Sequence, residues 1–196
     1  MPYSLDALSD NCYSGTAVLI NKLNIRDEAE LEKIEAELVS ARSVQWEIAP
    51  RVDTFSFAHY KAVNRFLFGD LYAWAGQARK VNISKKGTNF CPANQIKGRA
   101  GLIFARLKRK NLFKDLSMPE YIAEIVDFYC ATNDLHPFRE GNGRTQRVFL
   151  TQLIRHAGHD IDFSEMDGDL LMIATIQAAG GVTQPLEELF TESIRE

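Results

Sequence analysis

Hydrophobic residues recur at intervals of three and four along most of this chain, which is the spacing of one face of a helix. One such stripe starts after Asp27 and ends before Pro50, and it comprises Leu31, Ile34, Leu38, Ala41, Val44 and Ile48. A second starts at Ser56, continues to Gly76, and comprises Phe57, Tyr60, Val63, Leu67 and Phe68. Both stripes predict helices that face a common core, and Trp74 is expected to lie in that core.

Ser117 and Glu120 form a capping box, which predicts the start of a helix. This helix is the most apolar one in the sequence, so we expect it to be central and to end at His136. The remaining helices are expected to follow Pro92 and Gly143, to begin near Ser164, and to span residues 184–194.

A two-residue period occurs convincingly in one place, at about residues 80–91. Residues 80–84 alternate, residues 85–87 have turn composition, and residues 88–91 return, so the segment predicts a β-hairpin. Its composition suits a solvated ribbon as well as a functional flap. Residues 1–24 are mixed and polar, and they predict a partly ordered N-terminal segment. The expected fold is mainly α: a single helical domain over residues 1–196 with one short β-hairpin.

Residues 136–147, with the sequence HPFREGNGRTQR, combine chemistry that a core does not need, and we name them the signature loop. His136 precedes a proline, which disfavours the helical region, so the preceding helix should stop there. Gly141, Asn142 and Gly143 allow a backbone shape that ordinary residues resist. The loop leads into a helix whose first N–H groups have no intrahelical partner, so it predicts an anion site.

The side chains of the signature loop indicate which anion. Arg144 and Arg147 are three apart and share one helix face, and two guanidinium groups suit a polyphosphate. Glu140 would repel phosphate unless a divalent cation lay between them, and Mg²⁺ takes carboxylate and phosphate oxygens together. His136 is the group that accepts a proton near neutral pH. The set predicts a nucleotide phosphate site with a general base.

This string resembles the signature of the Fic (filamentation induced by cAMP) family, H-P-F-x-[D/E]-G-N-G-R-x-x-R. The defined positions are matched by His136, Pro137, Phe138, Glu140, Gly141, Asn142, Gly143, Arg144 and Arg147. The segment LFGDLYAWAGQAR also resembles the family's segment before its hairpin, with Asn64 where members commonly have a His. Agreement across the full signature argues against a loop that only caps a helix.

The resemblance implies a protein adenylyltransferase that transfers AMP from ATP to a hydroxyl side chain of a target protein. His136 would be the catalytic base and Glu140 the Mg²⁺ ligand, while Gly141, Asn142, Gly143, Arg144 and Arg147 would bind the nucleotide. The family's hairpin covers the nucleotide and docks the target segment, so Lys86 and Gly87 become candidate nucleotide contacts. Related Doc kinases carry Lys at the position of Gly143, which favours AMP transfer over phosphorylation here.

Two alternatives to AMP transfer from ATP stay open. One keeps the fold and uses another donor, such as UTP, GTP or CDP-choline, as some relatives do. The other is a nucleotide-sensing module that binds ATP without turnover and uses its hairpin only to dock a protein. The presence of both His136 and Glu140 counts against such a module, because binding alone needs no base.

Composition narrows the class of protein. A formal net charge of −3 argues against direct binding to nucleic acid, and no apolar stretch is long enough for a membrane span. Cys12, Cys91 and Cys130 are odd in number and too scattered for a zinc site. Reduced thiols, and therefore a cytoplasmic location, are expected.

The resemblance also concerns control of the activity. Fic proteins are commonly inhibited by a helix with the pattern S/T-x-x-x-E-G/N, whose Glu pairs with the second signature arginine, here Arg147. The segments that approach it, at Glu47 and Glu187, both lack the closing Gly or Asn. We therefore expect a small antitoxin to supply the inhibitory Glu to Arg147, with self-inhibition through Glu47 as the alternative. Relatives of that kind are toxins that modify type II topoisomerases, DNA gyrase and topoisomerase IV.

Overall fold

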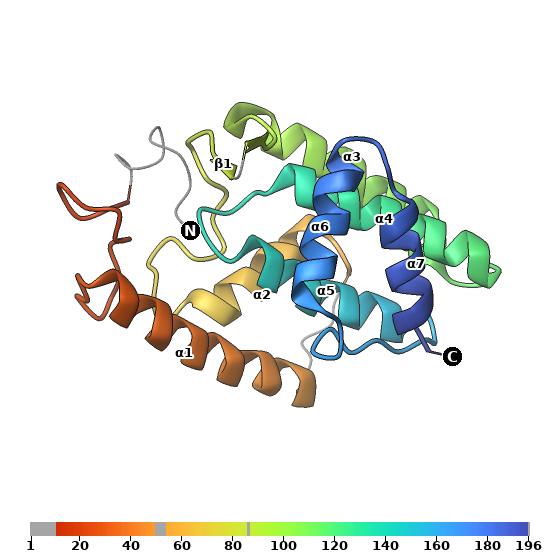
Figure 1. Ribbon diagram of the computed structural model, residues 1–196, viewed down its shortest axis with the longest axis horizontal. Coiled ribbons are helices and arrows are strands. Elements are labelled where there is room, and N and C mark those ends of the chain that lie inside the picture. Colours follow the sequence, from red (N-terminus) through yellow and green to blue (C-terminus); the bar gives the residue numbers. More distant parts are fainter. Residues whose placement is uncertain (1–10, 50–53, 86, 196) are drawn as a thin grey trace.

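The structure, a computed structural model, describes residues 11–49, 54–85 and 87–195. Within these ranges the chain forms seven α-helices and one short antiparallel hairpin (Figure 1). Their bounds are α1 Glu28–Ile48, α2 Phe57–Phe68, β1 Ser84–Lys85, β2 Thr88–Asn89, α3 Ile96–Arg109, α4 Met118–Leu135, α5 Asn142–His156, α6 Gly168–Ala179 and α7 Gln184–Ser193. Short 3₁₀ turns at Ala93–Gln95 and Asn111–Phe113 flank α3. The predicted mainly helical fold with one short hairpin is confirmed.

The capping signals in the sequence act where they were predicted. Asp27 accepts a hydrogen bond from the Glu30 N–H at 2.8 Å and starts α1. Ser117 and Glu120 form the capping box of α4, with Pro119 in its first turn. These caps satisfy N–H groups that the first turn of a helix leaves without partners. The start of α6 was predicted at Ser164, but the helix begins at Gly168, where the preceding Asp167 caps it.

The second helix is shorter than predicted. α2 ends at Phe68, and the chain turns at Gly69 instead of continuing as a helix to Gly76. The N–H groups of Leu71 and Tyr72 both donate to the Phe68 carbonyl oxygen, which closes this turn. The turn buries Leu71 and Tyr72 together against the core, and this joint burial is what the helical pattern did not anticipate.

The apolar stripe predicted for α1 is wrong near the C-terminal end of the helix. Leu31, Val39 and Trp46 are buried, whereas Val44 is 54% exposed and Ile48 is 79% exposed. Polar side chains occupy intervening turns of the inward face: Glu35 and Arg42. The face of α1 that packs on α2 contains charged residues. An apolar pattern alone therefore identified the wrong face near the end of the helix.

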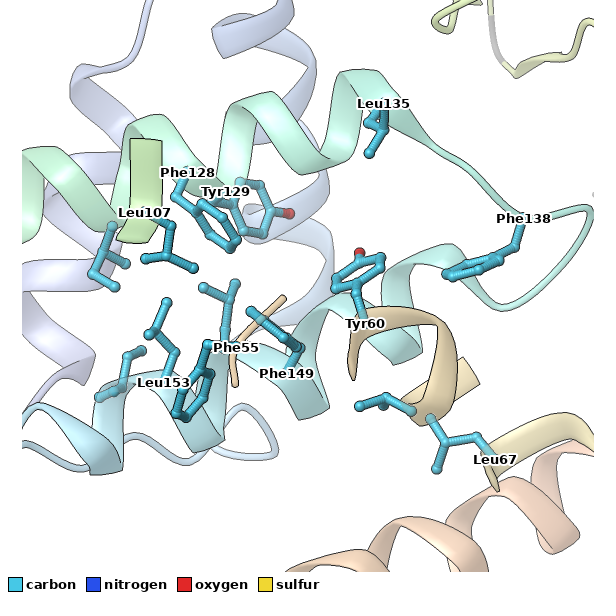
Figure 2. Close-up of a cluster of buried hydrophobic side chains, with 14 of the residues drawn as sticks. Phe55, Tyr60, Leu67, Leu107, Phe128, Tyr129, Leu135, Phe138, Phe149 and Leu153 are labelled. Carbon is cyan, nitrogen blue, oxygen red and sulfur yellow. The ribbon is translucent and has the colours of Figure 1, made fainter. Parts of the chain in front are cut away.

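The core is one cluster in which α4 and α5 pack on each other and α2 packs on α5. Figure 2 shows Tyr60 of α2 beside Phe138, and their rings stack with centroids 5.7 Å apart. Phe138 is 0% exposed, so the prediction that it anchors the signature loop to the core is confirmed. Trp74 is only partly buried, although it packs on the core through Tyr72. The core therefore holds the signature loop through Phe138 near its start and through α5, which begins inside the loop and packs on α2 and α4.

The peripheral elements lie around this core. In Figure 1, α1 runs along the lower edge of the molecule and the hairpin lies at the upper edge, while α6 and α7 pack on each other and on α4. Residues 1–10 of the predicted N-terminal segment lie outside the described residues. The rest of the segment includes an isolated antiparallel β-bridge, a backbone pairing between Cys12 and Leu19. Across the described ranges, no helix has both the length and the apolar character that crossing a membrane requires.

Candidate active site

A cavity of about 660 Å³ lies where the hairpin, the end of α4, the start of α5 and one face of α6 meet. The lining residues that belong to the predicted site are His136, Glu140, Gly141, Asn142, Gly143, Arg144 and Arg147. Lys86 lies outside the described residues. Gly87 lies at the exposed tip of the hairpin and does not line the cavity, whereas Lys85 and Thr88 do. The signature loop therefore gathers at one cavity, and the hairpin meets it through neighbours of the predicted tip residues.

His136 is the C-cap of α4 and adopts a left-handed backbone conformation, with φ 38° and ψ 59°. Its Nδ1 lies 3.1 Å from the Asn133 carbonyl oxygen, which can only accept, so Nδ1 carries the proton. The acceptor lone pair of the neutral ring is then on Nε2. Burial is the main cause that lowers the pKa of His136 to about 3; the bond to Asn133 opposes this shift, and the charges of Arg79 and Lys85 add to it. The imidazole is therefore a neutral acceptor at ordinary pH.

Phe90, which follows β2, stacks on the His136 ring with centroids 3.7 Å apart and an interplanar angle of 13°. Both side chains line the cavity. This contact joins the hairpin segment to the signature loop, and the buried His136 is only 8% exposed. Phe90 had no predicted role, because an aromatic residue in a predicted strand is ordinarily a packing residue.

The signature loop is closed by its own asparagine. The Asn142 side chain accepts a hydrogen bond from the Phe138 N–H at 2.8 Å and donates one to the Phe138 carbonyl at 2.8 Å. Gly141 has φ 78°, and a Cβ on it would lie 2.1 Å from the Phe68 ring, so only glycine fits there. The predicted amide donor of Asn142 is therefore used inside the loop, and the residue can offer the nucleotide its backbone N–H.

The start of α5 lies where the sequence predicts an anion site. Its hydrogen-bond ladder begins with the Thr145 N–H and the Gly141 carbonyl, which leaves the earlier N–H groups of the first turn without intrahelical acceptors. Arg144 and Arg147 lie on the first turns beside them and line the cavity. Burial lowers the pKa of Arg147, and the charge of Arg144 lowers it further. Cations and N–H donors therefore converge where a polyphosphate would lie.

Glu140 fits the predicted magnesium ligand. Its Oε1 accepts from the Gly141 N–H at 2.7 Å and lies 3.4 Å from Arg144 Nη2, while Oε2 has no hydrogen bond within the described part of the chain. In those same ranges, no cluster of three or more His, Cys, Asp or Glu side chains is arranged for a metal ion. A single carboxylate beside a phosphate site is the arrangement in which Mg²⁺ takes its remaining ligands from phosphates and water.

Arg79 is a buried positioning residue that the sequence analysis missed. Its guanidinium donates to the carbonyl oxygens of His136 at 2.8 Å and Val81 at 2.7 Å, and also to that of Cys91 at 2.5 Å. The backbone N–H of Arg79 donates to the Pro137 carbonyl oxygen at 2.8 Å. These bonds tie both sides of the hairpin base to the peptide units at His136 and Pro137. Its position in the segment before the hairpin was visible in the sequence, but its acceptors are distant backbone groups.

Comparison with known proteins agrees with this geometry. A profile described as "Fic/DOC family" matches residues 54–154. A probable protein adenylyltransferase, y4lH, from Sinorhizobium fredii is 39% identical over 89% of this chain and 90% of its own length. The protein adenylyltransferase VbhT from Bartonella schoenbuchensis is 34% identical over 92% of this chain, but over only 38% of its own length.

Solved structures agree with the sequence comparisons. The BepC protein, a VirB-translocated effector from Bartonella tribocorum crystallised with bound AMPPNP, superposes with a TM-score of 0.90 at 30% identity. The superposition covers 95% of this chain and 97% of that one. The fold, the family profile and the relatives named protein adenylyltransferases all lead to the same assignment, and this chain belongs to the Fic/DOC family.

Proposed function

We propose that this protein transfers AMP from ATP to a hydroxyl side chain of a target protein. The observation that carries the proposal is the neutral, buried His136 in the same cavity as the first amides of α5 and two arginines. A phosphate site alone would need no such base. The names of the curated relatives and the AMPPNP bound to the BepC protein support the reaction type and the nucleotide.

In the proposed reaction, Nε2 of His136 takes the proton of a Ser, Thr or Tyr hydroxyl as that oxygen bonds to the α-phosphorus of ATP. The bond from the α-phosphorus to the bridging oxygen breaks, and pyrophosphate leaves with the electron pair. The amides of the first turn of α5, together with Arg144 and Arg147, stabilise the phosphate charge. Mg²⁺, held by Glu140 and the phosphates, would supply charge neutralisation.

The target is proposed to dock along the hairpin. β1 and β2 pair through Ser84 with Asn89 and Lys85 with Thr88, and the described sheet contains these two strands only. A target segment in extended conformation can therefore add to an outer edge of the hairpin by backbone hydrogen bonds. The cavity reaches the hairpin at Lys85 and Thr88, so such a segment would bring its hydroxyl close to His136. A type II topoisomerase is the proposed target, and modification of purified gyrase or topoisomerase IV tests it.

Labelled ATP separates AMP transfer from its alternatives. Transfer of an α-phosphate label from ATP to a protein of a bacterial lysate is expected, and transfer of a γ-label would instead indicate a kinase. Transfer of neither label would favour another donor or a nucleotide sensor. His136→Ala should still bind ATP while its transfer rate falls by about 10² to 10⁴, the usual contribution of a positioned base. Wild-type rates in that variant would refute the assigned mechanism.

Control by a separate antitoxin is part of the proposal. Arg147 has no ion pair in the described ranges, and no carboxylate contributes to its pKa shift. Glu35 is the residue of α1 that contacts Arg144, and Glu47 lies about 18 Å further along the helix axis, at 1.5 Å per residue. Glu187, the other candidate, already accepts a hydrogen bond from the Thr183 hydroxyl at 2.8 Å. α6 also exposes Leu170, Ile173 and Ile176 beside the cavity, an apolar face that suits a partner helix.

The antitoxin proposal makes a direct prediction about the isolated chain. The purified protein should be active, and Glu47→Gly should not raise its rate. A nearly silent wild type that Glu47→Gly activates several-fold would place the inhibitory glutamate in this chain. The cytoplasmic location remains a prediction, and the unpaired thiols of Cys12, Cys91 and Cys130 are compatible with it.

A further inference from the structure

Glu35, on α1, is a charged residue on the inward face of a helix that precedes the region matched by the family profile. Its side chain is only 12% exposed, which is uncommon for a glutamate without specific partners. The sequence pattern predicts α1 only as a packing helix, and Glu35 has no predicted role. Its partners show that the helix also contributes to the phosphate site.

Both carboxylate oxygens of Glu35 are engaged. Oε1 accepts from Arg144 Nη2 at 2.5 Å, and Oε2 accepts from the Tyr72 hydroxyl at 2.5 Å. Burial, together with the neighbouring Glu35 carboxylate, raises the pKa of Tyr72, so the phenol stays protonated and donates. The guanidinium carbon of Arg144 also lies 4.7 Å from the centre of the Phe68 ring. Arg144 is therefore held by a carboxylate at one edge and by an aromatic face beneath it.

The hydrogen-bond donors of Arg144 are divided between these partners and the cavity. Nη2 is directed at carboxylates, that of Glu35 at 2.5 Å and that of Glu140 at 3.4 Å. For Nε and Nη1, no hydrogen bond occurs within residues 11–49, 54–85 and 87–195. Arg144 lines the main cavity and also a smaller cavity of about 250 Å³ on the side of Glu35. The residue therefore lies between the two cavities, and donors not used by the carboxylates remain for a ligand.

We propose that Glu35 and Tyr72 are positioning residues for Arg144, fixing its guanidinium so that its remaining donors bind a nucleotide phosphate. The inference deepens the proposed function and rests on it for the identity of the ligand. Arginine has a long flexible side chain, and holding it in place before binding reduces the entropy lost when phosphate binds. Burial opposes the charge of Arg144, but the carboxylates of Glu35 and Glu140 raise its pKa and keep it cationic.

The opposite effect of Glu35 would be repulsion of the phosphates by its negative charge. Glu32 provides a matched control for this effect. It lies one turn earlier on α1, lines the same smaller cavity and is exposed. No hydrogen bond or ion pair joins Glu32 to Arg144 in the described ranges. Glu32→Gln thus removes a charge at a similar place without disturbing the arginine, and Glu35→Gln removes the charge that holds it.

The experiment measures binding of AMPPNP by calorimetry and AMP transfer with ATP, in the full chain and its variants. Glu35→Gln should weaken AMPPNP binding and raise the KM for ATP by about five- to tenfold, with a smaller change in kcat. Tyr72→Phe, which removes only the hydroxyl, should weaken binding about two- to fourfold, since Glu35 keeps its contact with Arg144. Glu32→Gln should leave binding within about twofold of the wild type.

A double-mutant cycle with Arg144→Ala identifies the route of the effect. In the Arg144→Ala background, Glu35→Gln should no longer change AMPPNP affinity, because the group that it positions is absent. A lowered Tm with unchanged affinity would show that Glu35 only fastens α1, and tighter binding or faster transfer would show that it opposes the nucleotide. Either result refutes the proposal.

The outcomes also separate this inference from the proposed function. A wild type that binds AMPPNP while Glu35→Gln binds it equally well refutes the inference and leaves AMP transfer intact. A wild type that binds no nucleotide refutes both. Binding with no transfer to any protein refutes the proposed reaction, while the affinity series still decides the role of Glu35.

Discussion

The burial of His136 makes the stability of the fold depend on pH, and replacing this residue should remove that dependence. Its pKa is lowered from 6.5 to about 3, chiefly by burial, so the folded protein keeps the imidazole neutral where the unfolded chain protonates it. The unfolded state therefore binds more protons between these two values, and stability falls as the pH drops below about 6.5. Above that value both states are neutral, and His136 contributes no pH dependence.

The size of the effect follows from the two pKa values. At about pH 5 the unfolded imidazole is almost fully protonated and the folded one almost fully neutral, which costs about 2 kcal/mol of folding free energy relative to about pH 7.5. His136→Asn removes the titrating group. Asparagine is a suitable replacement because it tolerates the left-handed conformation that His136 adopts. Carboxylates and the other histidines titrate in both proteins and cancel in the comparison.

Urea unfolding of the wild type and of His136→Asn at both pH values measures the difference. The wild type should lose about 2 kcal/mol more than the variant on going from about pH 7.5 to about pH 5. A difference below about 0.5 kcal/mol would mean that the folded imidazole titrates near its ordinary pKa. The stacking of Phe90 on His136 would then not exclude water from the ring, and the assignment of a permanently neutral base would fail.

Four further variants test other parts of the site. Glu140→Ala should weaken ATP binding about tenfold with Mg²⁺ present and much less with a chelator, by calorimetry, because the carboxylate acts chiefly through the metal. Gly141→Ala should destabilise the fold by about 2 to 4 kcal/mol in urea because of its positive φ and its contact with Phe68, whereas Gly143→Ala, whose Cβ would lie 3.5 Å from Arg147 Nη1, should not. Arg79→Lys should cost about 1 to 3 kcal/mol in the same assay, because one ammonium cannot reach the carbonyls at both sides of the hairpin base.

The residues of the predicted site are contiguous in the sequence, so local rules could place them together. Residues 136–147 specify a helix end, a glycine turn and a helix start by local rules, so His136, Glu140 and the arginines meet at one cavity as expected. The hairpin was also predicted, since its period and its turn residues are local. What local rules do not give is the side of each element that packs. Thus Gly87 was chosen at the tip, while Lys85 and Thr88 line the cavity.

Glu35 shows why this limit matters for function. In the sequence it interrupts an apolar pattern, and a charged residue within a helical stripe is ordinarily assigned to the solvent face. Leu31 and Val39 lie one turn before it and one turn after it, and both are buried. That spacing was the available signal, because residues four apart share a face. Its meaning depended on Arg144, which lies far away in the sequence.

Asn64 shows how a departure from the family pattern can be satisfied by its surroundings. Its Oδ1 accepts from the Gly76 N–H at 2.7 Å, and its Nδ2 donates to the Thr145 hydroxyl at 3.0 Å and to the Glu140 carbonyl at 3.3 Å. A neutral imidazole at this fully buried position has one donor and one acceptor. It could accept from the Gly76 N–H but donate to only one of the Thr145 hydroxyl and the Glu140 carbonyl. Asparagine serves all of them, and it thereby ties α2 to the backbone of Glu140 and to the start of α5.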